Sequence, residues 1–445
     1  MARLLLRLLD LAGFGAVEQI MRHRSFRIYL FGHIPNVVGV WVVRVAIGWL
    51  GWQLTGSAFW LGALAAADTM PGLVLGPFGG ALADRLDRLK ISIYTQAALC
   101  IIAVFLAVLT VSGLMTIWIL FALSLSRGIT ASFWQPVRLA MMPNLVPRAE
   151  MPTAIALNSS TFHTAQFVGP ALATGLLTLG GPSLAFAFNV IAAGAMVGVL
   201  LAINMPSTAV AKHKRNSMIA DIVVGIRYGL THAGIGPMLL LLLVLGIGIR
   251  PVSELLPGFA DLIFGLDVGG YSMMVSSVGL GAMSGAIWML RQGNRGSITA
   301  IALRSGVVGG AAGLLFALTS WLPLAMVCLV VLGFSMTSGG IATQQLVQLA
   351  VPDELRGRVL SLFGMIFRAG PGAGALAMGW IADATGLAWP VGVGAAIGLA
   401  AFVFANGRRE RLQSLLEDQN DARVDTVAGA DLTEASSPPA GRAAE

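Results

Sequence analysis

The chain has 445 residues, of which 56% are hydrophobic and only 11% are charged, and its net charge is +7. In an ordinary globular domain about a quarter of the residues are charged, so this chain could not cover its own surface in water. That excludes a soluble enzyme, a nucleic-acid-binding protein and a disordered protein. The composition predicts a helical protein that crosses the lipid bilayer many times and has no nucleic-acid partner.

The predicted helices begin after a basic, amphipathic segment, 1–27, which we expect on the cytoplasmic membrane surface. The chain then contains about twelve apolar stretches, each near the ~20 residues that a membrane-spanning helix needs. Lipid offers backbone groups no hydrogen-bond partner, which favours helices. The stretches are roughly 28–54, 59–83, 91–113, 115–137, 151–179, 183–204, 236–264, 268–290, 298–320, 322–347, 358–383 and 387–406.

Lysine and arginine are concentrated in alternate connections between these stretches. The connection 55–59 has none, whereas the next one contains Arg85, Arg88 and Lys90, and the alternation continues along the chain. Because basic residues remain on the cytoplasmic side of a membrane, both termini are predicted to be cytoplasmic.

A polar cytoplasmic linker, 206–235, separates two halves, 28–205 and 236–407, and a polar tail, 408–445, is expected to be cytoplasmic and partly disordered. The halves repeat at a fixed offset, since Gly76 and Gly281 differ by 205 positions, as do Pro147 and Pro352. Fused repeats of this kind are typical of transporters with a substrate site between the repeats. The predicted fold is an all-α membrane protein with about twelve helices in two pseudo-symmetric six-helix bundles.

The connection after the second predicted helix reads Gly80-Ala-Leu-Ala-Asp84-Arg85-Leu-Asp87-Arg88 and resembles the loop signature of the major facilitator superfamily. More narrowly, the chain is similar to the transmembrane secretion effector branch, which includes enterobactin-exporter-like proteins, in stretches such as Pro143-Asn-Leu-Val-Pro147 and Leu256-Pro257-Gly-Phe-Ala260. The resemblance implies an alternating-access carrier in a bacterial cytoplasmic (inner) membrane. Members of this branch are mostly exporters, often driven by proton influx.

The same resemblance implies a gating latch on the cytoplasmic side. Asp84 would bond to Arg88 and Arg138 and would face the positive start of helix eleven, while close helix packing would use Gly76 and Gly80. Asp87 stands where the family pattern has glycine. The implied latch residues are Gly76, Gly80, Asp84, Arg85, Arg88, Arg138 and Arg358. In helix five, Gly169 and Pro170 resemble part of the antiporter signature of the superfamily.

Charged residues inside the apolar stretches are candidates for function, because each costs about 2.5–3.5 kcal/mol at the bilayer centre. Arg44 and Asp68 are predicted at equal depth on adjacent antiparallel helices, about 15 Å from the outer turn. We expect them to form an ion pair that is either structural or proton-sensitive. Arg250 and Glu254 share a helix face, and Glu254 is the second candidate for carrying a proton.

Other embedded residues have two interpretations each. Arg127 and Arg368, near the middle of helices four and eleven, either bind an anionic group or are held by carbonyls and acids. His33 and His163 either titrate or form hydrogen bonds that serve packing. Trp41 and Trp134 either stack on an aromatic substrate or have a lipid-interface or packing role. The embedded set is net cationic, which favours an anionic or catechol-like cargo.

We therefore predict a monomeric secondary transporter that exports a small organic molecule, siderophore-like or drug-like, in exchange for protons and without a cofactor or metal. Two other classes remain open: a lipid or lysolipid flippase, and a non-transporting sensor or scaffold on a carrier fold. The sequence contains no recognisable phosphate loop, metal cluster or nucleophile–base motif, so an enzyme is not expected.

Overall fold

The structure, a computed structural model, describes residues 15–203, 227–229, 231–292 and 296–418. The start of the predicted N-terminal segment, most of the predicted linker and most of the C-terminal tail therefore lie outside the described residues. Within the described ranges every regular element is a helix, which confirms the predicted all-helical class.

The first half of the chain supplies α2 to α8. These are α2 (Gly15–Met21), α3 (Arg24–Thr55), α4 (Ala58–Thr69), α5 (Pro71–Arg85), α6 (Arg88–Val111), α7 (Ile117–Met141) and α8 (Met151–Ala202). The second half supplies α10 (Ile235–Gly248), α11 (Val252–Gly258), the π-helix Phe259–Ile263, α12 (Val268–Gln292), α13 (Ile298–Leu318), α14 (Leu322–Ala350), α15 (Asp353–Thr385), α16 (Ala388–Gly407) and α17 (Arg409–Gln413).

Eleven stretches of helix in the described residues are long and apolar enough to cross a membrane. One of them, α8, has 52 residues and would be about 78 Å long at 1.5 Å per residue, more than twice the hydrocarbon thickness. Its helical geometry breaks at Gly180 and Gly181, where Gly181 has φ 67°. Glycine alone adopts that conformation without strain. Counted as two spans, α8 brings the described helices to the predicted twelve.

The seventh span is interrupted, as a stretch that contains Pro251 and Pro257 is expected to be. Helix α10 ends at Gly248 and α11 begins at Val252, after Pro251. Proline has no backbone N–H and its ring clashes with the preceding turn. The interruption places Arg250 at the junction of the two helices.

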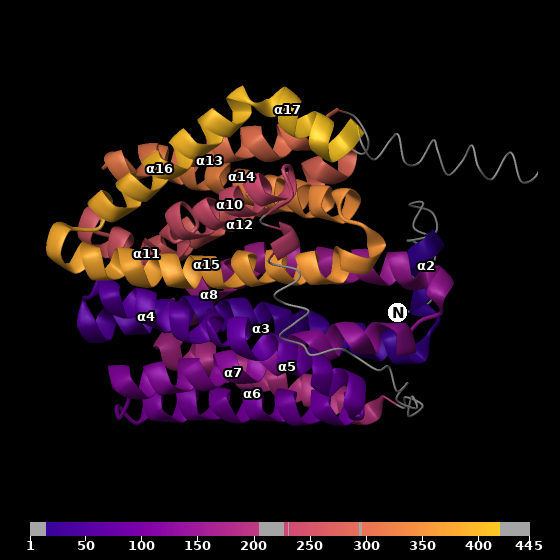
Figure 1. The fold of residues 1–445 in the computed structure, drawn as a ribbon. Helices are drawn as coiled ribbons and strands as arrows, with labels where there is room; N and C mark the ends of the chain where they lie inside the picture. The colour runs from indigo at the N-terminus through magenta and orange to yellow at the C-terminus, as the bar shows by residue number, and fades with distance from the viewer. Residues whose placement is uncertain (1–14, 204–226, 230, 293–295, 419–445) are drawn as a thin grey trace, which may run out of the picture.

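The two ends of the helical bundle differ in charge. One end, here called the neutral end, holds the connections 55–58, 111–117, 263–268, 318–322 and 385–388, which contain no Lys or Arg. The opposite end, here called the basic end, holds the connections 85–88 and 141–151, with Arg85, Arg88 and Arg148. In Figure 1 the helices run from the neutral end on the left to the basic end on the right, where α2 lies.

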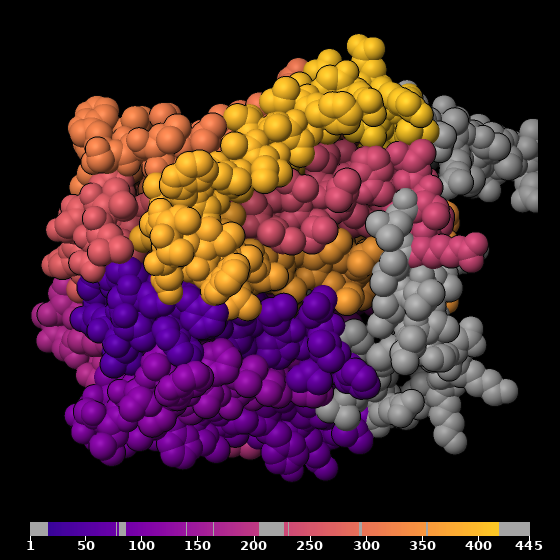
Figure 2. Space-filling model, turned by 60° about the vertical axis from the view of Figure 1, so that its left-hand side comes forward, coloured from indigo at the N-terminus to yellow at the C-terminus, as the bar shows by residue number. Residues whose placement is uncertain are grey.

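The two halves lie side by side, and their surfaces meet in the space-filling view (Figures 1 and 2). Helix α15 packs along α4, and α12 packs along α8. Toward the neutral end a single hydrophobic core contains residues of both halves, including Trp52, Leu64, Leu256 and Leu387. Toward the basic end each half has its own hydrophobic core. One surrounds Phe26 in the first half, and the other lies entirely within the second half. The halves are therefore joined at the neutral end.

Candidate functional site

Four embedded charges lie at similar depth in the bundle. Counted along their helices from the neutral end, Arg44 in α3, Asp68 in α4, Arg127 in α7 and Glu254 in α11 are each roughly ten residues in, or about 15 Å. That depth corresponds to the middle of a bilayer whose hydrocarbon core is about 30 Å thick. The depth predicted for Arg44 and Asp68 thus agrees with the depth counted from the observed ends of their helices.

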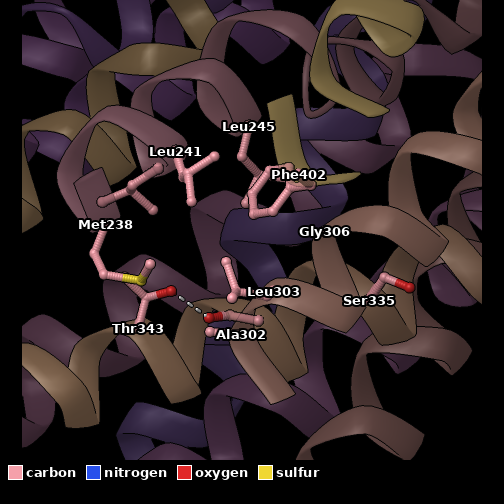
Figure 3. A pocket seen from close by; sticks show the side chains of 11 residues that line it. Met238, Leu241, Leu245, Ala302, Leu303, Gly306, Ser335, Thr343 and Phe402 are labelled. Atoms are coloured by element: carbon pink, nitrogen blue, oxygen red, sulfur yellow. Dashed lines mark hydrogen bonds between the residues drawn. The ribbon is translucent and has the colours of Figure 1, made fainter. Parts of the chain in front are cut away.

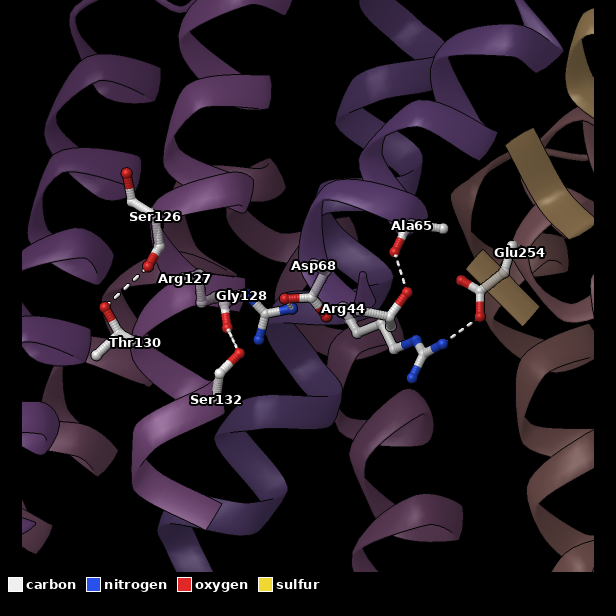
Figure 4. A network of polar contacts seen from close by, with 10 residues as sticks. Arg44, Ala65, Asp68, Ser126, Arg127, Gly128, Thr130, Ser132 and Glu254 are labelled. Carbon is white, nitrogen blue, oxygen red and sulfur yellow. Dashed lines mark hydrogen bonds and ion pairs between the residues drawn. The ribbon is translucent and has the colours of Figure 1, made fainter. Parts of the chain in front are cut away.

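The partners of these charges differ from the predicted ones. Nη2 of Arg127 lies 2.7 Å from Oδ1 of Asp68, within the first half. Arg44 forms its ion pair with Glu254, across the two halves. The predicted Arg44–Asp68 ion pair is therefore wrong, although Asp68 remains within electrostatic range of Arg44. Figure 4 shows the two pairs side by side at the interface.

Aromatic rings surround the Arg44–Glu254 pair. The Arg44 guanidinium lies 5.5 Å from the centroid of the Trp41 ring. Trp49 of the first half stacks on Tyr271 of the second, with centroids 5.8 Å apart. The Trp41 Nε1 donor is buried and has no hydrogen-bond partner among the described residues. The pair thus lies in an aromatic setting with an unused donor nearby.

Arg250 is held by Phe367 of α15. Its Nη1 donates to the Phe367 carbonyl oxygen at 2.6 Å, and its guanidinium lies 4.0 Å from the centroid of the Phe367 ring. A neutral carbonyl and a ring face hold the side chain in place, and the Glu254 carboxylate remains within electrostatic range of it. Phe367 directly precedes Arg368, so two cations occur together on the second half.

Arg368 faces a third cation. Its side chain is exposed, and it lies within electrostatic range of Arg138 in α7. Arg138 donates to Asn158 Oδ1 at 2.6 Å and to Gln135 Oε1 at 3.0 Å, which are neutral acceptors. Among the described carboxylates, none lies within ion-pair distance of Arg138, Arg250 or Arg368. These three arginines therefore form a local group of positive charge without an ion pair to a described acid.

Helices α4 and α15 are in close contact near the neutral end. A Cβ atom added to Gly62 would lie 2.2 Å from the Ala375 carbonyl oxygen, and one added to Gly372 would lie 2.2 Å from Oγ1 of Thr69. Nothing lies within 4 Å of the equivalent positions at Gly76 and Gly364. The close contact between α15 and the second span thus lies toward the neutral end, and Arg368 lies one turn from Gly372 in the direction of the basic end.

The same geometry corrects one expectation about packing. Gly76, predicted at a close helix contact, has open space beside it. Gly79 takes that role instead, since a Cβ atom there would lie 2.8 Å from the Ser132 carbonyl oxygen. Gly169 does allow α8 to approach α3, with the added Cβ atom 2.4 Å from Cβ of Trp41. Pro170 follows it inside α8.

Of the remaining predicted residues, His33 contacts Arg138, Trp134 lies in a hydrophobic core, and the side chain of His163 is outside the described residues. His33 is buried, its ring stacks on Tyr29 with centroids 5.2 Å apart, and its Nε2 lies 3.4 Å from Nη1 of Arg138. Trp134 is buried in the core cluster around Phe26, a placement that favours packing over substrate contact. His163 lies in α8, but its side chain is outside the described residues.

The cytoplasmic latch implied by the family resemblance is only partly described. The surroundings of Gly80 and the side chains of Asp84 and Arg85 lie outside what the structure describes, so the latch stays a prediction. Arg88 donates to the Ala140 carbonyl oxygen at 2.9 Å, and Arg358 lies in the first turns of α15.

Asp87, which departs from the family pattern, has a clear local role. Its Oδ1 accepts from the backbone N–H groups of Leu89 at 2.9 Å and Lys90 at 3.3 Å. The side chain therefore caps the N-terminus of α6.

A pocket inside the second half is a weaker candidate for the site. Its space amounts to about 10 Å³, room for at most one water molecule. Apolar side chains such as Leu241 and Phe402 dominate its lining, with Thr343 and Ser335 at its edge (Figure 3). It contains none of the embedded charges. No group of metal-binding side chains occurs in the part of the chain that the structure describes.

Sequence reasoning missed several contacts that join the halves. Nε1 of Trp52 donates to Oδ2 of Asp261 at 2.7 Å, and Oδ2 of Asp383 accepts from Ser57 Oγ at 2.6 Å. The sequence does not predict that Asp261 or Asp383 joins the halves. Both are acids close to the neutral end of a helix in the second half, which is the signal that could have found them.

Known proteins resemble this chain in sequence and in fold. The family model described as transmembrane secretion effector matches residues 19–434. An enterobactin exporter of Shigella boydii serotype 4 is 24% identical over 80% of this chain and 85% of its own length. A multidrug efflux pump of Mycolicibacterium fortuitum is 28% identical over 80% of this chain and 89% of its own length.

Solved transporter structures share the fold. A peptide transporter bound to alafosfalin has a TM-score of 0.72 at 12% identity and covers 88% of this chain and 96% of its own. A human organic anion transporter has a TM-score of 0.63 at 14% identity, with 85% and 98% covered. This multi-pass membrane protein is thus a transporter and not an enzyme, and the chain belongs to the transmembrane secretion effector family of the major facilitator superfamily.

Proposed function

We propose that this protein is a secondary active exporter in a bacterial cytoplasmic membrane, which exchanges a small organic molecule for protons. The observation that carries the proposal is the Arg44–Glu254 ion pair, which joins the two halves at mid-depth. Two relatives are an enterobactin exporter and a multidrug efflux pump, and this similarity supports export of an organic molecule. The predicted orientation places the basic end and both termini in the cytoplasm.

The position of the ion pair gives a mechanism for coupling. Alternating access requires the halves to separate at the neutral end, and separation there breaks the bond between Arg44 and Glu254. A proton on the Glu254 carboxylate removes the attraction that opposes separation, whereas loss of the proton restores it. Proton binding from the outside would therefore favour the state that is open to the outside.

The charges around the interface support an anionic cargo. Arg138, Arg250 and Arg368 have no described acid partner, and guanidinium groups bind carboxylates and phenolates through paired, charge-assisted hydrogen bonds. Arg368 is exposed and lies one turn from the close contact at Gly372, in the direction of the basic end. A siderophore-like organic anion matches this arrangement better than a cationic drug does.

Flux measurements in proteoliposomes test the proposal. Enterobactin serves as the anionic probe and ethidium as the cationic one, each with and without an imposed pH gradient. We expect the gradient to accelerate enterobactin flux and to leave ethidium flux unchanged. If a fluorescent lysophospholipid moves and neither probe does, the protein is a flippase. If none of the three moves in liposomes that contain folded protein, a non-transporting role replaces the proposal.

Two variants separate coupling from transport. Glu254→Gln should reduce the acceleration by the pH gradient at least tenfold, about 1.4 kcal/mol, while exchange of enterobactin across the membrane without a gradient persists. Glu410→Gln is the matched control, because this acid in α17 is exposed and lies outside the network. Full acceleration by the gradient in Glu254→Gln would contradict the coupling role of Glu254.

A further inference from the structure

An acid of the second half is bound to the start of a helix in the first half. Asp383 lies in the last turn of α15, at the neutral end. Its Oδ2 accepts a hydrogen bond from Ser57 Oγ at 2.6 Å, and its Oδ1 accepts from the backbone N–H groups of Ala58 at 2.7 Å and Phe59 at 3.4 Å. The carboxylate therefore holds the connection between α3 and α4.

Asp383 belongs to α15 but caps the N-terminus of α4. The N-cap residue of α4 is Ser57, and its side chain forms no cap hydrogen bond within its own helix. The first backbone N–H groups of a helix have no partner inside it, and a negative charge there interacts favourably with the helix dipole. Asp383 supplies both the acceptor and the charge, so opening the halves at this point leaves the start of α4 without its cap.

The backbones approach closely enough for this contact because of a glycine. A Cβ atom added to Gly379 would lie 2.2 Å from the Ala58 carbonyl oxygen, so any side chain there would push α15 away from α4. Gly379 is one turn before Asp383 on the same helix face. The glycine and the acid together place the carboxylate against the start of α4.

The sequence around Asp383 matches the sequence around Asp84. The end of α15 reads Gly379-Trp-Ile-Ala-Asp383, and the end of α5 reads Gly80-Ala-Leu-Ala-Asp84. The second span, α4 with α5, runs from the neutral to the basic end, whereas α15 runs in the opposite direction. Each of the two antiparallel spans thus ends in glycine, two variable residues, alanine and aspartate, and each aspartate falls at the end where the other span begins.

We propose that Asp383 is the gating latch of the neutral end, the counterpart of the latch that the loop signature places at the basic end. Hydrogen bonding of Asp383 to the start of α4 stabilises the state that is closed at the neutral end, and the bonds break when that end opens. The bond between Trp52 and Asp261, at the same end, acts in the same direction. The inference rests on the proposed alternating-access function, to which it adds the element that controls the outer gate.

Distances between spin labels in the full chain test the latch without any transport assay. The free cysteines, Cys100 and Cys328, are first replaced by alanine. Labels are then attached through Ser112→Cys in the first half and Ser320→Cys in the second, both exposed near the neutral end. We expect a short distance to dominate in the parent protein. Asp383→Ala should raise the ratio of long to short distances about tenfold, in line with the loss of hydrogen bonds to a charged group.

Asp267→Ala is the matched control. Asp267 also caps a helix at the neutral end, accepting from the backbone N–H groups of Gly269 at 2.9 Å and Gly270 at 3.2 Å. Its cap lies within the second half, so its loss should leave the distance ratio unchanged. An equal shift in both variants would mean that any lost cap loosens this end, and the latch proposal would be wrong.

Asp383→Asn covers the case in which the alanine variant does not fold. Asparagine keeps one acceptor oxygen and loses the charge, so we expect a smaller shift toward the long distance. An unchanged distance ratio in folded Asp383→Asn and Asp383→Ala would overturn the proposal. These distances are measured without substrate or gradient. The latch proposal can therefore fail while flux is normal, and the proposed transport function can fail while the distances change as expected.

Discussion

The two mid-depth ion pairs have the same chemistry and different positions in the fold. Arg127 and Asp68 belong to α7 and α4, both in the first half, and their side chains are 12% and 21% exposed. Arg44 and Glu254 belong to different halves, and Arg44 is 37% exposed. Under the proposed alternating access, a pair within one half would keep its partners, whereas a pair between the halves would break once in each cycle.

The comparison indicates what each pair contributes. An arginine largely enclosed within one half needs its acid permanently, because an unpaired charge there has little access to water. An arginine at an interface that opens can be hydrated or can bind cargo when its acid is released. The Arg127–Asp68 pair is thus expected to matter most for stability, and the Arg44–Glu254 pair for the balance between conformations.

The largest expected effect is on stability in the first half. Asp68→Asn removes the charge that pairs with Arg127 and leaves a largely enclosed cation without a counter-charge, which should lower the free energy of unfolding by about 3 kcal/mol. Thermal unfolding of the purified protein in detergent measures the change. Replacing both residues by leucine should restore most of the loss, since paired apolar side chains leave no charge unpaired. A double variant as unstable as Asp68→Asn would show that Asp68 acts through other contacts.

The sequence predicted the depth of these charges but not their partners. Depth follows from counting residues along a helix, so Arg44 and Asp68 were correctly expected at one level. The direction in which each side chain points depends on how the helix is rotated and on which helix is opposite. Those are set by packing between segments far apart in the chain, and for this reason the Arg44–Glu254 contact, 210 positions apart in sequence, was not predicted.

The next effect in size concerns the pair between the halves. Arg44→Glu places two acids face to face and should raise the ratio of long to short label distances at the neutral end about tenfold, equivalent to about 1.4 kcal/mol. The exchanged variant Arg44→Glu/Glu254→Arg restores the attraction and should return the ratio to near that of the parent. Its failure to do so would mean that the pair does not hold the halves together.

Other features show which signals the sequence carries well. The all-helical fold, the alternation of charge and the break at Pro251 follow from local composition, and each occurs in the structure. Asp383 was missed because its partner is the backbone at the start of another helix. Almost every residue has a backbone N–H group, so the sequence does not show which of them binds an acid. The pairing of the Gly379–Asp383 and Gly80–Asp84 patterns becomes informative only once α4 and α15 are known to be antiparallel neighbours.

The smallest expected effect comes from a single hydrogen bond between the halves. Trp52→Phe keeps a buried ring but removes the Nε1 donor that binds Asp261 at 2.7 Å. The loss should raise the ratio of long to short distances about fivefold, or about 1 kcal/mol, the usual net worth of one hydrogen bond. Trp49→Phe is the control, because Trp49 contacts the second half by stacking on Tyr271, and phenylalanine can keep that contact. Equal shifts in the two variants would mean that ring packing keeps the neutral end closed. The hydrogen bonds to acids at that end would then not stabilise the closed state.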